Sequence, residues 1–278
     1  MEEKNKAISY SLFGFGKQRQ ENCFEFNSYL RGLMINIRLA RLIYPDWIVI
    51  LNIDHQSFLA YETMLKRLPI KVNINDEAPL TKAMLWRMKP CFESYYAVIC
   101  RDLDSPLTYR EAQCVEIWCS NSKCVHAITD SISHNVPMLG GMVGFKPYDF
   151  VRTCGYSNWD DMISSVNMDW SRKGADQDFL NQYIYKIYSQ PQNDSITQHY
   201  FKGMPNTYLS DYHNSIPNIE LNNVNQSYAE SNNICGHIGS AGWYEPSLFK
   251  FLKKHWDKFE DLIEIEKEHP QIFYWVNE

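Results

Sequence analysis

The strongest chemical signal in this sequence is the run from Arg101 to Ser105, which reads Arg-Asp-Leu-Asp-Ser. It follows an apolar segment, Tyr96 to Cys100, that is typical of a buried strand. Side chains two positions apart on extended backbone point the same way, so Asp102 and Asp104 are expected to reach one cation together. Paired carboxylates suit Mg²⁺ or Mn²⁺, and these ions often bridge substrate phosphates. The run therefore predicts a cation site that handles a pyrophosphate.

The residues after this run favour the same interpretation. Ser105 and Pro106 form a break, and a helical pattern follows from Thr108 to Trp118. Thr108 is a plausible N-cap, with Glu111 three residues on as the partner in a capping box. Asp-x-Asp also arises by chance, and Asp is common in turns. A strand, an acidic turn and a capped helix are nonetheless how an α/β sheet presents ligands at its carboxyl ends.

Two candidate phosphate or sugar contacts precede this run. Gly14 and Gly16 end a predicted strand over 7–13, and glycine permits close approach of the backbone to a ligand. A plain tight turn explains them equally well, and no third glycine completes a dinucleotide fingerprint, which argues against a Rossmann oxidoreductase. Arg87 could clamp a phosphate with two hydrogen bonds, although taken alone it is more typical of a surface helix.

Three later segments could complete a site. His134 leads into Gly140 and Gly141, which is typical of a binding loop or of a hairpin. Asp176 and Asp178 open a helix, where acidic residues favour the helix N-terminus, and either could act as a base. His237 lies between glycines and could ligate a cation, although a lone histidine usually does not.

Composition limits the classes of function. The chain has 278 residues, 45% of them hydrophobic, which is enough for a full core. Its net charge of −6 argues against a nucleic-acid binder. We expect no targeting segment and no membrane span, and the eight cysteines show neither a C-x-x-C pair nor zinc spacing. We therefore expect reduced thiols and a cytoplasmic protein, in the host cytoplasm if the source is viral.

The order of predicted elements indicates a mainly parallel twisted sheet flanked by helices. Apolar strands and amphipathic helices alternate through the first half. Strands are predicted at 7–13, 47–53, 70–74, 96–100 and 125–128, and helices at 27–43, 56–67, 80–88, 108–118 and 176–187. We expect one α/β domain, with a catalytic part over 1–245 and a helical extension over 246–278 packed on it.

Taken together, the motifs resemble those of GT-A-fold glycosyltransferases with a DxD motif, a GT-A-like and Rossmann-like α/β fold. The resemblance is greatest to a bacterial and giant-virus group with an R-D-x-D-S-x-x-x-x-R-E core, which this chain matches from Arg101 to Glu111. Leu139-Gly140-Gly141-Met142, Gly174-Ala175-Asp176-Gln177 and the late Gly-His237 follow in the same order. The match spans roughly residues 7 to 242.

The resemblance implies a role for each candidate residue. Asp104, Asp102 and His237 would hold Mn²⁺ or Mg²⁺, and Asp176 or Asp178 would lie at the reaction centre. The donor, a UDP- or GDP-sugar, would contact Phe13, Gly14, Arg87, Arg101, Asp102, Gly140 and Gly141. The implied activity is transfer of the sugar to a hydroxyl acceptor, a glycan or another molecule. A sugar nucleotidyltransferase and an inactive glycan-binding protein of the same fold remain alternatives.

Overall fold

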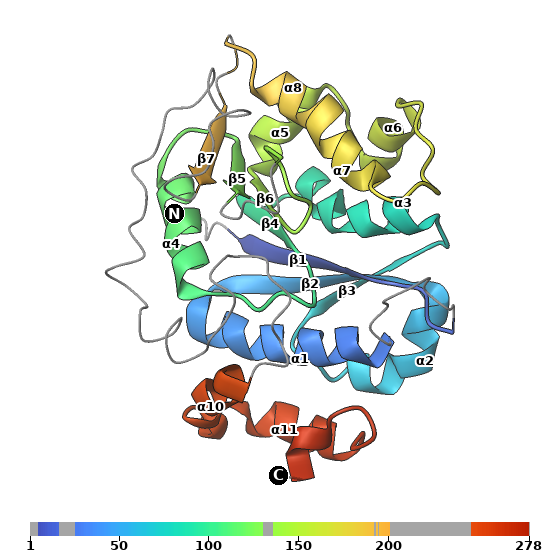
Figure 1. The fold of residues 1–278 in the computed structure, drawn as a ribbon, viewed down its shortest axis with the longest axis vertical. Coiled ribbons are helices and arrows are strands. Elements are labelled where there is room, and N and C mark those ends of the chain that lie inside the picture. The colour runs from blue at the N-terminus through green and yellow to red at the C-terminus, as the bar shows by residue number, and fades with distance from the viewer. Residues whose placement is uncertain are drawn as a thin grey trace.

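A seven-stranded mixed sheet runs through the protein and carries helices on both faces (Figure 1). The computed structural model describes residues 5–16, 26–129, 136–191, 193, 195–200 and 246–277. The strands are β1 (Lys6–Leu12), β2 (Trp47–Asp54), β3 (Lys71–Asn75), β4 (Ala97–Arg101), β5 (Val125–Thr129), β6 (Met142–Phe145) and β7 (Ile196–Tyr200). Their order in the sheet is β3-β2-β1-β4-β6-β5-β7.

Strand direction divides the sheet into two parts. β1 is parallel to both of its neighbours, β2 and β4, and β2 is parallel to β3. The short strand β6 is antiparallel to both β4 and β5, and β5 pairs in parallel with β7. The sheet is therefore mainly parallel, as the alternation of elements predicted, with one reversed strand inserted beside β4.

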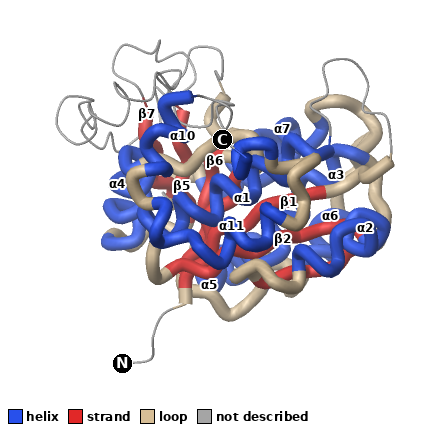
Figure 2. The backbone as a smooth tube through the Cα atoms, turned by 90° about the horizontal axis from the view of Figure 1, so that it is seen from below, coloured by secondary structure: helices blue, strands red, loops and turns tan. Residues whose placement is uncertain are grey.

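Helices form a layer on each side of the sheet (Figures 1 and 2). The helices are α1 (Phe26–Ile43), α2 (His55–Leu65), α3 (Leu80–Met84), the 3₁₀ helix η1 (Leu85–Phe92), α4 (Tyr109–Ser120), α5 (Pro147–Cys154), α6 (Trp159–Ser164), α7 (Ala175–Phe179), the π-helical turn η3 (Leu180–Ile184), α8 (Tyr185–Tyr188), α10 (Pro246–Lys253), η4 (Trp256–Phe259), α11 (Glu260–Lys267) and η5 (Tyr274–Asn277). In Figure 1, α1 and α2 lie below the sheet, while α3, α5, α7 and α8 lie above it.

Each face of the sheet has its own hydrophobic core, because alternate residues of a strand point to opposite sides. On one face, Ile8 and Tyr10 of β1 pack with Leu33 and Ile37 of α1. On the other face, Val98 of β4 belongs to a second cluster, which η1, α5 and α7 complete. These two cores fix β1 and β4 from both sides, and so fix the loops at their ends.

The direction of the chain changes at the boundary between β1 and β4. From β1 the chain continues to β2 and β3 on one side, whereas β4 adds to the other side. In open α/β sheets, ligands bind outside the carboxyl ends of the strands at such a switch point. The acidic run from Arg101 to Ser105 and the turn at Gly14 both lie at this point.

The segment after 245 differs from the single helix over 246–268 that its sequence predicts. It forms α10 and α11, separated by η4, and these helices lie against α1 (Figure 1). Leu248, Leu252 and Leu262 are fully buried in the same core as α1. Phe259, at the end of η4, is also buried in this core at 0% exposure. No helix among the described residues has the length and apolar character needed to cross a bilayer.

The segment predicted as one helix over 80–88 is also different in detail. α3 ends at Met84, and the tighter 3₁₀ helix η1 continues through Pro90 to Phe92. Proline has no N–H to donate and clashes with a continuing α-helix, which explains the change of geometry. The consequence is local but important, because η1 carries Arg87.

Candidate active site at the carboxyl ends of β1 and β4

The acidic run forms a turn, and not the extended backbone that we expected. β4 ends at Arg101, and the N–H of Ser105 donates to the carbonyl of Asp102 at 3.3 Å. The argument from strand alternation is therefore wrong for Asp102 and Asp104. The turn still brings the two carboxyl groups close enough to interact electrostatically.

Asp104 lies in a largely buried position. Burial, and next to it the neighbouring charge of Asp102, raise the pKa of its carboxyl group from 3.8 to about 6. Arg87 and Arg101 act in the opposite direction but do not cancel the effect. A carboxylate that is costly to ionise without a nearby positive charge is well suited to bind a cation.

Helix α1 holds this turn from the side of the sheet opposite Arg87. The buried amide of Asn36 donates to the carbonyls of Leu103 and Ser105 at 3.1 and 3.2 Å, and accepts from the N–H of Leu107 at 3.0 Å. Gly32 lies so close to Leu103 that a side chain there would overlap the carbonyl group. The sequence analysis missed both residues, although a polar residue within the apolar stripe of α1 was a usable signal.

Arg87 reaches the turn from η1. Its backbone N–H donates to Ser11 Oγ at 2.9 Å, and its carbonyl accepts from Cys100 Sγ at 3.3 Å. These two contacts fix η1 over β1 and β4. The guanidinium Nη1 then donates to Asp102 Oδ1, with the Arg87 side chain 4% exposed and that of Asp102 41% exposed. Arg87 therefore belongs to the site and not to a helix surface.

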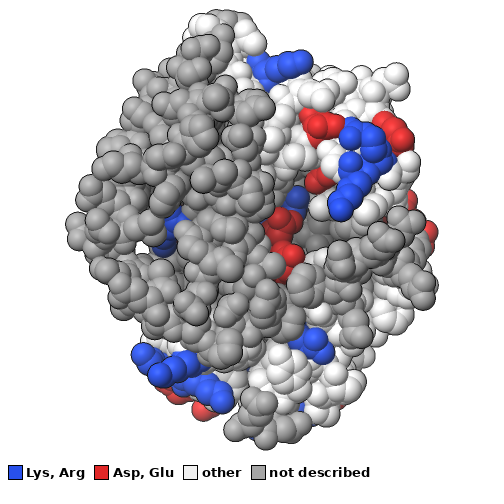
Figure 3. Space-filling view, in the orientation of Figure 1, with Lys and Arg blue, Asp and Glu red and all other residues white. Residues whose placement is uncertain are grey.

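The glycine loop, residues 138–141, closes the site from a third direction. A side chain at Gly141 would overlap the carboxyl group of Asp102, and one at Gly140 would overlap the guanidinium of Arg87. Asp176 Oδ2 lies 3.7 Å from the position that a Cβ of Gly140 would take. Only glycine allows the loop backbone to approach these charged groups so closely. Figure 3 shows acidic and basic side chains together in a hollow on this face of the molecule.

Helix α7 separates the two candidate bases. Asp176 is 6% exposed, and burial raises its pKa, while the nearby Arg87 partly offsets that rise. Asp178 instead forms an ion pair at the surface with Arg172. Gln177, between them, donates to the carbonyl of Met138 in the glycine loop. The structure thus brings Asp176 to the site and places Asp178 in a surface ion pair.

The end of β1 is held by the start of α2. Gly14 adopts φ 83°, and its N–H donates to Asp54 Oδ2 at 2.8 Å. Asp54 also caps α2 through the N–H of Ser57, and Ser57 Oγ accepts from the N–H of Phe15. Phe13 is buried against Trp86 of η1, with ring centroids 5.8 Å apart. Asp54 directly follows the predicted strand over 47–53, and its neighbours in the sequence do not indicate that it shapes the turn at Gly14.

The side chain of Arg101 is not in the position that the family resemblance implies, which is a contact with the donor. Its side chain is 1% exposed and turns to the α4 side of the sheet. There its Nε lies 3.1 Å from Glu111 Oε1, and its Nη1 donates to the carbonyl of Gly141. Thr108 caps α4 as predicted, but the Glu111 side chain also serves this ion pair. Arg101 thus supports the glycine loop from behind.

The residues present fit a hard divalent cation. Asp102 and Asp104 offer carboxylate oxygens, and Mg²⁺ is commonly bound by one or two carboxylates together with substrate phosphates. Among the described residues, no group of three or more His, Cys, Asp or Glu side chains is arranged to hold a metal. His237, the third predicted ligand, lies outside the described residues, as does His134.

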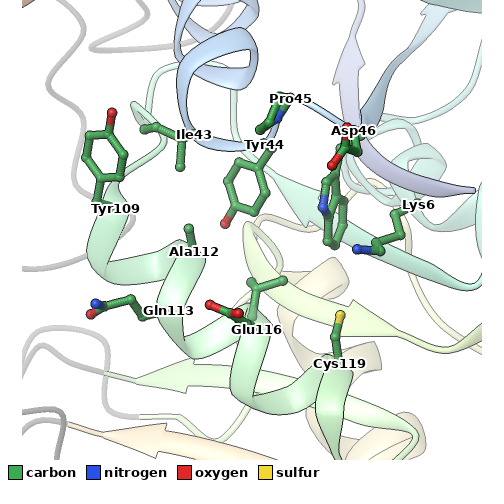
Figure 4. Close-up of a pocket in the computed structure, with 12 residues that line it drawn as sticks. Lys6, Ile43, Tyr44, Pro45, Asp46, Tyr109, Ala112, Gln113, Glu116 and Cys119 are labelled. Carbon is green, nitrogen blue, oxygen red and sulfur yellow. The ribbon is translucent and has the colours of Figure 1, made fainter.

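A separate hollow of about 370 Å³ lies away from these groups (Figure 4). It lies between α4 and the turn that joins α1 to β2, and Lys6, at the start of β1, forms one side. Asp102 and Asp104 both follow the carboxyl end of β4, whereas Lys6 marks the amino end of the neighbouring parallel strand β1. This hollow is therefore not part of the candidate active site.

Comparison with known proteins gives little beyond the fold. No family model matches the chain, and no curated protein matches it. Among solved structures, the chain is similar to 4-diphosphocytidyl-2C-methyl-D-erythritol synthase from Anaerococcus prevotii, at 8% identity and a TM-score of 0.45. The alignment covers 71% of this chain and 87% of that one. At this level of similarity, no residue role or activity is transferred from that enzyme to this chain.

Proposed function

We propose that this protein is a cation-dependent glycosyltransferase that moves a sugar from a nucleotide-diphospho-sugar to a hydroxyl acceptor. The proposal depends on one observation above all: two carboxyl groups, Asp102 and Asp104, lie with Arg87 at the switch point of a mainly parallel sheet. The resemblance of the sequence motifs to DxD glycosyltransferases supports the same activity, and Asp176 and the glycine loop converge on this place.

Each group has a defined task in this proposal. Phe13 and Gly14 border the nucleotide, and Arg87 binds the diphosphate through its guanidinium. Asp102 and Asp104 hold Mn²⁺ or Mg²⁺, which when bound stabilises negative charge on the departing diphosphate. The backbone of Gly140 and Gly141 leaves room for the sugar.

Asp176 removes the acceptor proton if transfer inverts the configuration of the sugar. Its raised pKa, which results from burial, makes it a stronger base than an exposed aspartate. Its carboxyl group also lies beside Arg87, so the base and the diphosphate contact share one small region.

The proposal is tested by measuring release of nucleoside diphosphate from UDP- and GDP-sugars, with and without Mn²⁺. Asp104→Asn should abolish the cation-dependent release. Asp46→Asn changes an exposed turn residue before β2, at the end of the parallel strands opposite the acidic turn. It serves as the matched control and should keep wild-type activity. A wild-type protein that neither releases the diphosphate nor gains thermal stability from any donor with Mn²⁺ would contradict the proposal.

A sugar nucleotidyltransferase is the second candidate, because a glycine turn follows β1. Gly14 and Gly16 adopt φ values of 83° and 73°, a backbone geometry suited to a phosphate-binding loop. Such an enzyme would form the nucleotide-sugar from a nucleoside triphosphate and a sugar phosphate, with release of pyrophosphate. The product separates the two candidates: pyrophosphate from the triphosphate supports this one, and nucleoside diphosphate from the nucleotide-sugar supports the first.

A further inference from the structure

We propose that Arg101 and Glu111 are positioning residues, whose buried ion pair holds the glycine loop against Asp102 without contact with substrate. The structural part of this inference stands on the contacts themselves. Its consequence for catalysis rests on the proposed function.

The ion pair is buried and points away from the face that carries Arg87. The side chains of Arg101 and Glu111 are 1% and 2% exposed, and Arg101 Nε lies 3.1 Å from Glu111 Oε1. Glu111 lies in the first turn of α4, whose N-cap Thr108 accepts from the Glu111 N–H at 3.1 Å. The capped first turn therefore fixes the backbone of Glu111, and the ion pair joins its carboxylate to the guanidinium of Arg101.

The guanidinium passes this restraint on to the glycine loop. Arg101 Nη1 donates to the carbonyl oxygen of Gly141, in the residue just before β6. The Cα of the same glycine lies against the carboxyl group of Asp102, the residue that follows Arg101. Gly141 is thus held between two consecutive residues, one contacting its carbonyl and the other its Cα. A small shift of this peptide would change the space around Asp102.

A buried ion pair is not needed for stability alone. Well-packed apolar side chains of similar volume often stabilise a protein as well or better, because burying two charges is costly. The chain has another buried ion pair, Arg38–Glu266, which joins α1 to α11 at 2.6 Å with both side chains 0% exposed. That pair lies in the packing of the C-terminal helices: Arg38 also contacts the Met34 carbonyl and the rings of Trp256 and Phe259, which are not residues of the candidate site. It therefore provides a matched control.

The test compares Glu111→Gln with Glu266→Gln, each of which removes one buried charge and keeps the side-chain volume. Hydrogen exchange measured by mass spectrometry should quicken over the glycine loop, residues 138–141, in Glu111→Gln, and should stay at the wild-type rate there in Glu266→Gln, because loop amides exchange through local opening and not through global unfolding. We expect kcat for sugar transfer to fall about 10- to 100-fold in Glu111→Gln, as for residues that orient ligating groups, with the donor KM within about three-fold. Glu266→Gln should keep the wild-type kcat below its own unfolding temperature.

A second variant separates positioning from folding. In Arg101→Met/Glu111→Leu, apolar side chains replace both members of the pair, so no buried charge is left without a partner. The thermal stability of this variant should therefore equal or exceed that of Glu111→Gln. The Gly141 carbonyl still lacks its donor, so exchange over 138–141 should remain fast and kcat low. If slow exchange and kcat both recovered together with thermal stability, the inference would be overturned. Equal exchange in Glu111→Gln and Glu266→Gln would overturn it as well.

The two proposals can fail separately. If the wild-type protein transfers no sugar and binds no Mn²⁺ in the presence of UDP, the proposed function fails, and the exchange comparison still decides the role of the pair. If the wild-type protein is active and Glu111→Gln matches it in kcat and exchange, the positioning role alone is overturned.

Discussion

Arg87 and Asp102 form an ion pair that joins the 3₁₀ helix before β4 to the acidic turn after it. The guanidinium is almost fully buried, whereas the carboxyl group is partly exposed toward the face on which a ligand would bind. Asp176 and Gly140 border the same guanidinium. Arg87 therefore connects the three segments of the site, and a diphosphate would compete with Asp102 for it.

Replacing Arg87 should change the binding of cation and nucleotide in opposite directions. In Arg87→Met, Asp102 loses its positive neighbour, so Mn²⁺ alone should bind more tightly than to the wild type. UDP in the presence of Mn²⁺ should bind at least about ten-fold more weakly, because a charge-assisted contact is lost. Titration calorimetry measures both. Arg152→Met, in an exposed pair with Asp149, is the control, and equal values in both variants would contradict this prediction.

Replacing Asp104 should stabilise the protein in the absence of a divalent cation. The folded pKa of about 6 exceeds the ordinary 3.8, so the folded state retains the proton longer, and stability falls as pH rises from about 4 to 6. Asp104→Asn has no carboxyl group to ionise at this position, so it does not show this fall in stability with rising pH. At pH 7.5 in EDTA, its free energy of unfolding should exceed that of the wild type by at most about 3 kcal/mol. At pH 3.5 the two proteins should be equally stable, and chemical denaturation at both pH values provides the check.

Asp176 and Asp178 should differ sharply in their effect on turnover. Asp176→Asn removes the buried carboxylate beside Arg87, and we expect sugar transfer to fall about 10²- to 10⁴-fold with donor binding retained. Asp178→Asn breaks only a surface pair with Arg172 and should keep most of the activity. Steady-state kinetics and donor titration on both variants test the assignment, which an active Asp176→Asn protein would refute.

The pair Arg38–Glu266 should determine whether the C-terminal helices stay packed. Glu266→Gln leaves a buried guanidinium without its carboxylate partner, which typically costs about 3 to 5 kcal/mol. Urea denaturation measures this loss. Glu268→Gln breaks an exposed pair with Arg67, which solvent screens, and should lower stability far less than Glu266→Gln. A similar cost in both variants would mean that α11 contributes little to the stability of the domain.

Local sequence determined the elements and the motif. The strands β2 and β4 begin as apolar runs, and β1 is apolar except at Lys6, Ser9 and Ser11. Thr108 caps α4 through a short-range hydrogen bond, so these elements follow from neighbouring residues. The alternation of strands and helices indicated a mainly parallel sheet. The acidic pair was recognisable because two carboxyl groups directly after a buried strand form a specific local pattern.

Tertiary structure decided what surrounds that pair. The antiparallel insertion of β6 beside β4 carries the glycine loop to Asp102, and no short-range pattern specifies such a long-range pairing. The same pairing directs Arg101 to Glu111 and to the carbonyl of Gly141. Neighbouring residues do not specify the contacts of Asn36 and Arg87, because these contacts arise only when α1 and η1 pack on opposite faces of the sheet. The amino-acid sequence alone determines which groups are charged, and packing determines which of these charges come into contact.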